Sequence, residues 1–330
     1  MKKTILVTGG AGFIGSHLVR FLAKKYKDYL IINIDTLTYA SNYSYIKQLE
    51  QLDNYEFHKI DINDFDKLKQ LFKSYNFDTV IHLAAESHVD NSIDNPRIFA
   101  YTNVIGTLNL LENARHSWND LSGKLFYHIS TDEVYGSLNN QGFFSEESNY
   151  DPRSPYSASK ASSDHFVRAY HHTYEIPVII SNCSNNFGPN QNKEKLIPVV
   201  INSIINQNNI PVYGNGKNIR DWLYVEDHIS AIDKILHHGE LGETYLIGGG
   251  CEKSNLELID LIIDITDELL ERKSGFSKSL IHFVKDRKGH DFRYAIDYSK
   301  LTKKTFWKPS TNLKKNLHTT IEWYMSQNKS

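Results

Sequence analysis

The sequence is poor in cysteine and has no long apolar run. Cys183 and Cys251 are the only cysteines in 330 residues, so they provide no disulfide framework, and neither belongs to a metal-ligand spacing. Both are expected to be ordinary buried or half-buried side chains in a reducing compartment. No apolar run reaches the roughly 18 residues of a membrane span, and no apolar signal region or cleavage site precedes the first predicted strand. These absences predict a cytoplasmic protein with no membrane partner.

An excess of one charge is also missing. The formal net charge is −2, and acidic and basic residues alternate without a long basic run. Nucleic acid is therefore not expected as a partner, although a small anion needs only a local basic patch. The chain has no internal repeat and no low-complexity linker. Its length and its 40% hydrophobic content allow a large core in one elaborate domain or two lobes, as is typical of a globular enzyme.

The first motif is a strand, a glycine turn and a helix in direct succession. The strand predicted at 4–8 leads into Gly9-Gly10-Ala11-Gly12-Phe13-Ile14-Gly15, and a helical pattern follows. Gly9, Gly12 and Gly15 allow a tight turn, close approach of a pyrophosphate and close helix packing. The next strand, 29–34, ends in Asp35, where an acid can bind ribose hydroxyls and repel the 2′-phosphate of NADP. The motif predicts NAD binding, with a ligand-free glycine turn as the alternative.

Strands predicted at 55–60, 77–83, 124–129 and 176–181 alternate with helices up to residue 182. This rhythm predicts an α/β fold with a doubly wound parallel (Rossmann) sheet. Asp61 and Ile62 follow one strand and could contact adenine, although Asp61 or Asn63 could instead cap the next helix. Small residues follow another strand and form the expected wall of the cofactor site, which consists of Leu83, Ala84 and Ala85.

The chemistry is expected at the end of the strand 124–129. Thr131, Asp132 and Glu133 lie there with Ser130, at the sheet edge where ligands bind in open α/β folds. Tyr156 and Lys160 are spaced i,i+4 in the helix predicted at 155–173, so both lie on one helical face. A lysine ammonium beside a phenol favours phenolate and can bring its pKa from about 10 toward working pH. These residues predict a hydride-transfer site that also contacts the cofactor.

A second lobe is expected after a loop of amides and turn residues at 184–189. We predict an NAD-binding domain at 1–183, with a return segment near 219–247, and a mainly substrate-binding lobe at 184–330. Three segments, 195–198, 211–214 and 219–225, suit a charged ligand with a ring, and Arg220 offers a fork for phosphate. Ordinary loops or edge strands are the alternative for each segment.

The glycine motif, the Tyr156-x-x-x-Lys160 pair and the second lobe together resemble the extended short-chain dehydrogenase/reductases that act on nucleotide sugars. Within that family, Ser130–Gly136 is similar to the signature of the dTDP-glucose 4,6-dehydratases, whereas sugar epimerases have no acidic pair after the threonine. The resemblance covers nearly the whole chain and continues through 82–90, 184–186, 195–198, 220–225 and 286–291. The sequence departs from the family pattern at Asn91, Phe187 and Lys288, where arginine, tyrosine and proline are usual.

The resemblance implies bound NAD, dTDP-glucose as the substrate, and a homodimer in which the helices at 96–116 and 155–173 form a four-helix bundle. It implies that Asp132 acts as the acid and Glu133 as the base. The product would be dTDP-4-keto-6-deoxyglucose, a precursor in deoxysugar (dTDP-rhamnose) biosynthesis. The substrate-binding residues that it implies are Glu86, Ser87, Asn185, Lys195, Leu196, Pro211, Tyr213, Arg220, Asn255, Arg287 and His290.

The acidic pair is what separates the competing functions. Oxidation of a carbinol requires Tyr156, Lys160 and a hydroxyl such as Thr131. A ketone formed at C4 of a sugar then acidifies the C5 proton, so that a carboxylate can remove this proton while a carboxylic acid protonates the departing hydroxyl. An epimerase, or a dehydratase for another nucleotide sugar, is one alternative, and the acidic pair argues against simple epimerisation. A non-enzymatic dinucleotide-binding module is another, because fold alone does not assign function. Such a module would not need the complete set of catalytic residues.

Overall fold

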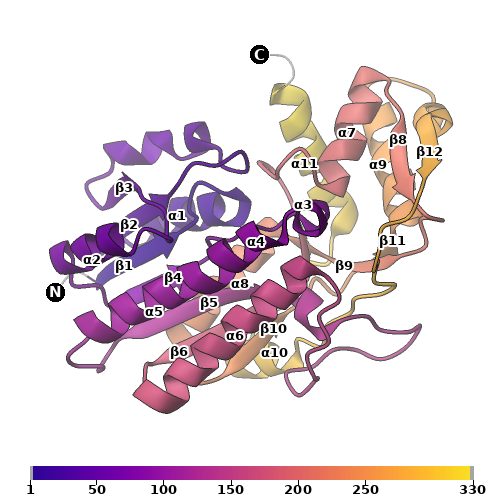
Figure 1. The fold of residues 1–330 in the computed structure, drawn as a ribbon. Coiled ribbons are helices and arrows are strands. Elements are labelled where there is room, and N and C mark those ends of the chain that lie inside the picture. The colour runs from indigo at the N-terminus through magenta and orange to yellow at the C-terminus, as the bar shows by residue number, and fades with distance from the viewer. Residues whose placement is uncertain (1–2, 328–330) are drawn as a thin grey trace.

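The computed structural model describes residues 3–327, which form a large parallel sheet with helices on both faces and a smaller lobe above one end (Figure 1). The seven strands of the sheet stand in the order β10-β6-β5-β4-β1-β2-β3, and every neighbouring pair is parallel. Their bounds are β1 Lys3–Thr8, β2 Tyr29–Asp35, β3 Tyr55–Lys59, β4 Thr79–His82, β5 Leu125–Thr131, β6 Val178–Cys183 and β10 Thr244–Ile247. This topology confirms the doubly wound sheet that the sequence predicts.

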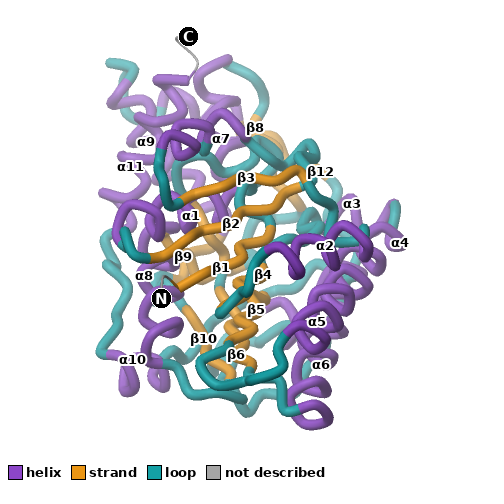
Figure 2. The backbone as a smooth tube through the Cα atoms, turned by 90° about the vertical axis from the view of Figure 1, so that its left-hand side faces the viewer, coloured by secondary structure: helices purple, strands orange, loops and turns teal. Residues whose placement is uncertain are grey.

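Two layers of helices bury the sheet (Figure 2). One layer contains α1 Phe13–Lys25, α8 Val225–His238 and α10 Ser299–Thr305, and the other contains α2 Phe65–Ser74, α5 Gly106–Ser117 and α6 Pro155–Tyr174. Each layer has its own apolar core against the sheet, since the strands are covered on both faces. Among residues 3–327, no helix is long and apolar enough to cross a membrane.

The two elements that carry the predicted chemistry have well-defined ends. All seven residues of β5 are buried, and α6 begins with a capping box in which the side chains of Ser154 and Ser157 each bind the other's backbone N–H. Both β5 and β6 extend two residues beyond their predicted ends, because Ser130 and Thr131 pair with Asn182 and Cys183. Polar residues continue these strands past the apolar pattern, which places Thr131 within the sheet.

The long helix predicted after Pro96 is interrupted. It starts with α4 Pro96–Phe99, widens into the π-helical segment η3 Ala100–Ile105, and continues as α5. The short helix α3 Val89–Asp94 precedes it. A π-helical turn inside a helix is often found at a functional site, and η3 lies beside the cleft described below.

The second lobe, at the upper right of Figure 1, is built on helices and two small sheets. Helices α7 Leu196–Asn206, α9 Asn255–Leu269 and α11 Leu313–Gln327 pack around a separate apolar core. One sheet contains β7 Asn185–Phe187, β9 Ile219–Tyr224 and β11 Glu252–Ser254, and the other contains β8 Ile210–Tyr213 and β12 Ile281–Val284. After β9 the chain returns to the large sheet through α8 and β10. The division into domains at residue 183 stays a prediction.

Candidate active site

A cavity of about 690 Å³ opens at the C-terminal ends of the central strands, between the sheet and the second lobe. It brings together most of the predicted site residues. From the sheet domain it is lined by Gly9, Gly12, Phe13, Ile14, Gly15, Asp35, Asp61, Ile62, Leu83, Ala84, Ala85, Glu86, Ser87, Thr131, Asp132, Glu133, Tyr156 and Lys160. Asn185 and Lys195 line it from the second lobe.

The glycine turn is packed so closely that side chains would not fit. Gly9 has a φ of +74°, and a Cβ atom there would lie 2.7 Å from the backbone of Ala84. A Cβ atom on Gly15 would lie 2.2 Å from the carbonyl oxygen of Gly9. Helix α1 has no acidic residue in its first turn, and Gly12 at its N-cap provides no side chain to bind the backbone N–H groups. The turn therefore fits a pyrophosphate, which helix N-termini favour.

Asp35 fixes the turn that it faces. One carboxylate oxygen accepts the N–H of Ala11 at 3.0 Å, and the other accepts the N–H of Leu37 and the hydroxyl of Ser41, each at 2.8 Å. The side chain thus ties the glycine turn to the loop after β2 while it lines the cavity. This placement is compatible with the predicted contact to a ribose.

The alternative interpretation of Asp61 and Asn63 as helix caps is wrong. The N-cap of α2 is Asp64, whose carboxylate accepts the N–H of Lys67 at 3.1 Å. Asp61 instead accepts the N–H of Asn63 at 2.8 Å in the preceding turn and lies on the cavity wall. The helix starts later because this turn occupies the residues directly after β3.

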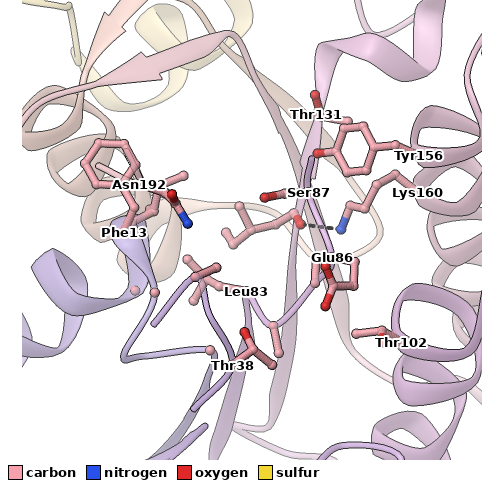
Figure 3. A pocket seen from close by; sticks show the side chains of 18 of the residues that line it. Phe13, Thr38, Leu83, Glu86, Ser87, Thr102, Thr131, Tyr156, Lys160 and Asn192 are labelled. Carbon is pink, nitrogen blue, oxygen red and sulfur yellow. Dashed lines mark hydrogen bonds between the residues drawn. The ribbon is translucent and has the colours of Figure 1, made fainter. Parts of the chain in front are cut away.

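Tyr156 and Lys160 reach into the cavity from α6, opposite Phe13 and Asn192 (Figure 3). The Nζ atom of Lys160 donates to the carbonyl oxygen of Ile129 at 2.9 Å, and the hydroxyl of Thr131 interacts with that of Tyr156. Burial and the charge of Glu133 raise the pKa of Tyr156 well above its ordinary value. The expected fall in the pKa of Tyr156 is therefore wrong in this structure, in which the Lys160 ammonium is bound to the backbone of β5.

Asp132 and Glu133 lie side by side in different surroundings. Asp132 is 1% exposed, and its Oδ2 atom has no hydrogen-bond partner among the described residues. Burial, with the charges of Glu133 and Asp221, raises the pKa of Asp132 well above its ordinary value. Burial also raises the pKa of Glu133, but the cations Lys195 and Arg220 oppose that rise. Burial without a hydrogen-bond partner for Oδ2 therefore favours the neutral form of Asp132, whereas Glu133 faces cations that favour its carboxylate.

Lys195 and Arg220 place positive charge beside the carboxyl pair. Lys195 precedes α7 and donates to the carbonyl oxygen of Ser87 at 2.8 Å. Leu196, the next residue, starts α7 and is not part of the cavity lining. Arg220 is 8% exposed, and its guanidinium binds the carbonyl oxygens of Ile219 at 2.8 Å and Asp291 at 3.0 Å. Its fork is thus occupied by the backbone in this structure.

The structure does not bring the remaining predicted residues to the cavity wall. Tyr213 lies in β8 beneath the guanidinium of Arg287, which is 4.5 Å from its ring centroid and 2.8 Å from Asp90. His290 contacts Asp286 at 2.6 Å, and Asn255 begins α9. Those outside the described lining are Leu196, Pro211, Tyr213, Arg220, Asn255, Arg287 and His290. Their roles in substrate binding stay predictions.

Some lining residues were not selected from the sequence. They include Thr38, Arg97, Tyr101, Thr102, Asn192 and Glu194. Tyr101 and Thr102 lie in η3, where the π-helical turn changes the direction of side chains relative to a regular helix. Asn192 and Glu194 lie in the loop that follows β7. The turn residues of that loop were a usable signal, whereas the π-helical turn has no simple sequence pattern. No cluster of three potential metal ligands occurs in residues 3–327.

The fold and the site together define an extended short-chain dehydrogenase/reductase. The defining features are a parallel sheet with a glycine turn after β1, a Tyr-x-x-x-Lys pair that faces the end of β5, and a second lobe over the cleft. The family model described as GDP-mannose 4,6 dehydratase matches residues 6–320. A dTDP-glucose 4,6-dehydratase of Haemophilus influenzae is 47% identical, and the match covers 99% of each chain. The chain therefore belongs to the dTDP-glucose 4,6-dehydratase family of nucleotide-sugar dehydratases, which confirms the resemblance seen in its sequence.

Solved structures of relatives agree with this assignment. The dTDP-glucose 4,6-dehydratase of Bacillus anthracis, in complex with NAD, has a TM-score of 0.88 at 42% identity, with 99% of this chain and 98% of that chain covered. A UDP-glucuronic acid 4-epimerase of Bacillus cereus, in complex with UDP-glucuronic acid and NAD, has a TM-score of 0.87 at 28% identity, with 98% and 99% covered. The fold is nearly as similar to an epimerase as to a dehydratase, so the reaction must be argued from the site.

Proposed function

We propose that this protein is an NAD-dependent dTDP-glucose 4,6-dehydratase that forms dTDP-4-keto-6-deoxyglucose. The observation that carries the proposal is the different environment of two adjacent carboxyl groups, Asp132 and Glu133. Two carboxyls whose pKa values are separated by their surroundings can divide the roles of acid and base. Elimination of water needs both roles, whereas epimerisation through a ketone needs neither.

The residues of the cleft fit NAD. The glycine turn leaves space for a pyrophosphate where a Cβ atom would not fit, and the carboxylate of Asp35 lies at the end of β2 on the cavity wall. An acid there favours ribose hydroxyls and repels a 2′-phosphate, so NAD is preferred over NADP. When bound, NAD supplies an acceptor for the hydride of sugar C4 and a donor that returns it to C6.

Tyr156, Lys160 and Thr131 serve the oxidation. The phenolate of Tyr156 takes the proton of the sugar 4-hydroxyl, and the hydroxyl of Thr131 interacts with the oxygen of Tyr156. Lys160 supplies a positive charge, which favours the phenolate. Its ammonium is already held at the end of β5 by the carbonyl oxygen of Ile129, at 2.9 Å.

Glu133 and Asp132 serve the elimination. The ketone at C4 acidifies the C5 proton, which the carboxylate of Glu133 removes, and Asp132 protonates the C6 hydroxyl as it leaves as water. Burial raises the pKa of Asp132 and so favours the protonated form that this role needs. Glu133 then returns a proton to C5 when the hydride reaches C6, so that the sugar is dehydrated and the cofactor is regenerated.

The residues proposed to bind the nucleotide base, the sugar and the diphosphate of the substrate lie on both sides of the cleft. Glu86, Ser87, Asn185 and Lys195 line the cavity, and Lys195 is a cation beside Glu133. Arg220 and Arg287 are further cations of the second lobe, and the charges of both reach Glu133. Residues 184–330 are thus proposed as the main substrate lobe and 1–183 as the NAD domain. The product is proposed to enter deoxysugar biosynthesis in the cytoplasm.

A homodimer is also proposed. The helical face formed by α3, α4, η3 and α6 exposes three large apolar side chains that are not part of the cavity lining, each at least 37% accessible, namely Ile93, Ile105 and Phe166. Exposed apolar side chains gathered on one surface are typical of an interaction site. A second copy of this chain is the proposed partner.

The test of the proposed reaction is incubation of the purified protein with dTDP-, UDP-, CDP- and GDP-glucose side by side. The proposal predicts a keto sugar from dTDP-glucose without net formation of reduced cofactor. Conversion of another nucleotide sugar in preference to dTDP-glucose would contradict the assigned substrate. Formation of a 4-epimer in place of a keto sugar would contradict the assigned reaction.

A further inference from the structure

Helix α6 carries a buried carboxylate, Asp164, that takes part in none of the proton or hydride transfers proposed above. Asp164 lies one turn after Lys160, and its relative exposure is 0%. Its Oδ2 atom accepts hydrogen bonds from the hydroxyls of Ser130 at 2.9 Å and Tyr150 at 2.7 Å, and from the amide of Asn182 at 3.2 Å. A buried carboxylate is costly unless it is paired and hydrogen-bonded, so these contacts keep an otherwise unfavourable charge inside the protein.

The carboxylate is ionised and faces one neutral imidazole and two cations. The charged and titratable groups around it are Lys160 and Arg168 of α6, His128 of β5, Tyr135 and Tyr150. Burial would raise the pKa of Asp164, but His128, Lys160 and Tyr150 outweigh it and lower that pKa below its ordinary value. Burial lowers the pKa of His128 to about 4, so its ring, 3.1 Å away, is neutral at pH 7. Lys160 and Arg168 therefore balance the charge.

The same network holds three consecutive residues at the end of β5. The carbonyl oxygen of Ile129 accepts from Lys160 at 2.9 Å, and the hydroxyl of Ser130 donates to Asp164. Asn182 bridges Asp164 and the carbonyl oxygen of Thr131, to which it donates at 3.0 Å. Asp132 and Glu133 follow directly. The network thus joins the oxidation residues of α6 to the elimination residues after β5, across 34 positions of sequence between Ser130 and Asp164.

We propose that Asp164 is a positioning residue of the reaction. Its carboxylate is the counter-charge of Lys160 and, through Ser130 and Asn182, fixes the strand end that carries Thr131, Asp132 and Glu133. The proposal rests on the proposed dehydratase function. Asp164 acts through these residues and lies outside the cavity lining, so it does not touch the reacting atoms.

The decisive variant is Asp164→Asn, which keeps the shape of the side chain and removes its charge. Without that charge the Lys160 ammonium is less favoured and is lost at a lower pH. The alkaline limb of the kcat/KM profile for dTDP-glucose should therefore move down by about 1 pH unit. Displacement of the strand end should lower kcat by roughly 10- to 100-fold, with KM changed by less than about threefold.

Asp267→Asn is the matched control. Asp267 is also 0% exposed and hydrogen-bonded to Ser277, but it lies in α9 of the second lobe. Both variants should lower the thermal midpoint, and only Asp164→Asn should move the alkaline limb. The positioning role would be overturned if both variants had the wild-type kcat and an alkaline limb of the kcat/KM profile at the wild-type pH.

Asp164→Glu keeps the charge and shifts the carboxylate by one methylene. The alkaline limb should stay in its wild-type position while kcat falls roughly 10-fold. This variant decides the matter if Asp164→Asn does not fold, and a wild-type kcat in Asp164→Glu would then overturn the proposal. Turnover by the wild-type protein is measured in the same assay. No turnover of dTDP-glucose by the wild-type protein contradicts the proposed function, whereas wild-type turnover with an unmoved alkaline limb in Asp164→Asn contradicts only the role of Asp164.

Discussion

At the scale of single residues, Glu133 differs from Asp132 in what surrounds its carboxyl group. Glu133 is half-buried and faces the cations Lys195 and Arg220, whereas Asp132 is buried without a partner for one oxygen among the described residues. Glu133→Gln removes the base and leaves Tyr156 and Lys160 intact. Reduced nicotinamide should accumulate on mixing with dTDP-glucose, while C5 proton exchange and product formation fall by roughly 10²- to 10⁴-fold.

Tyr156→Phe is the matched comparison for that experiment. It removes the base for the 4-hydroxyl, so the absorbance of reduced nicotinamide should not rise at all in a single turnover. If neither Glu133→Gln nor Tyr156→Phe formed reduced nicotinamide, the separation of oxidation from elimination would be contradicted. Glu133 would then be needed for substrate binding or for the oxidation itself.

His228 gives a test of stability against pH at the same scale. It is 0% exposed, its Nδ1 atom lies 2.8 Å from the side-chain oxygen of Asn186, and burial lowers its pKa from 6.5 to about 3. Below pH 6.5 this imidazole binds a proton in the unfolded chain but not in the folded chain, so the free energy of unfolding decreases as the pH falls toward 3. Between pH 6.5 and 5 the cost is about 2 kcal/mol.

His228→Gln should therefore flatten the pH dependence of the free energy of unfolding between pH 7 and 5, measured with urea. His318→Gln, at a side chain that is 44% exposed, is the control for the substitution itself. An unchanged slope in His228→Gln would show that the buried imidazole is protonated in the folded protein.

At the scale of elements, the turn between β1 and α1 depends on contact between backbones. A Cβ atom on Gly15 would lie 2.2 Å from the carbonyl oxygen of Gly9 and 2.8 Å from Cα of Gly10. Gly15→Ala should displace α1 and weaken NAD binding at least roughly 10-fold, since the pyrophosphate site is the turn itself. Isothermal titration with NAD measures the effect.

Gly123→Ala separates this effect from backbone strain. Gly123 has a φ of +71°, and a Cβ atom there would meet no described atom within 4 Å. The control should lose about 1 kcal/mol of stability and keep its affinity for NAD. Similar NAD affinities in the two variants would contradict the assigned role of the turn.

Elements with strong local patterns were predictable. The strand–turn–helix at residues 4–25 and the helix of Tyr156 and Lys160 follow from spacing and composition, and the structure has both. The π-helical turn at η3 was not predictable, because it depends on packing rather than on a local pattern. The pKa of Tyr156 was predicted in the wrong direction, since spacing reveals the neighbour Lys160 but neither the depth of burial nor the competing carbonyl oxygen of Ile129.

The second lobe marks the limit of prediction at this scale. Pro211 and Tyr213 lie in β8, which pairs with β12, so the segment 211–214 is the strand that the sequence allowed as an alternative, and a role of these residues as ligand contacts stays a prediction. Long-range pairing of this kind leaves no signal at the strand itself. Lys195 was selected because the segment 195–198 suits a charged ligand and continues the family resemblance, and in the structure it lines the cavity.

At the scale of the whole molecule, the proposed homodimer rests on the apolar face of α3, α4, η3 and α6. Phe166 of α6 is 37% exposed and Ile105 of η3 is 42% exposed. The double variant Ile105→Glu, Phe166→Glu should convert a homodimer into a monomer at micromolar concentration, because like charges would face each other across the two-fold axis. Light scattering measures the mass.

The surface control for assembly is Phe306→Glu. Phe306 follows α10 and is 90% exposed, but it lies outside the proposed face. Its variant should remain a dimer. A monomeric wild-type protein, or a dimer that survives the double variant, would contradict the proposed interface.

The central claim is that one hydride moves within one sugar, from C4 to C6, while Asp132 and Glu133 remove water between the two transfers. Its most direct test is turnover of dTDP-glucose deuterated at C4, with the product analysed by NMR. The account predicts dTDP-4-keto-6-deoxyglucose with the deuterium at C6 and no net reduced cofactor. Deuterium returned to C4 of an unchanged or epimerised sugar, or a keto sugar with no deuterium at C6, would contradict it.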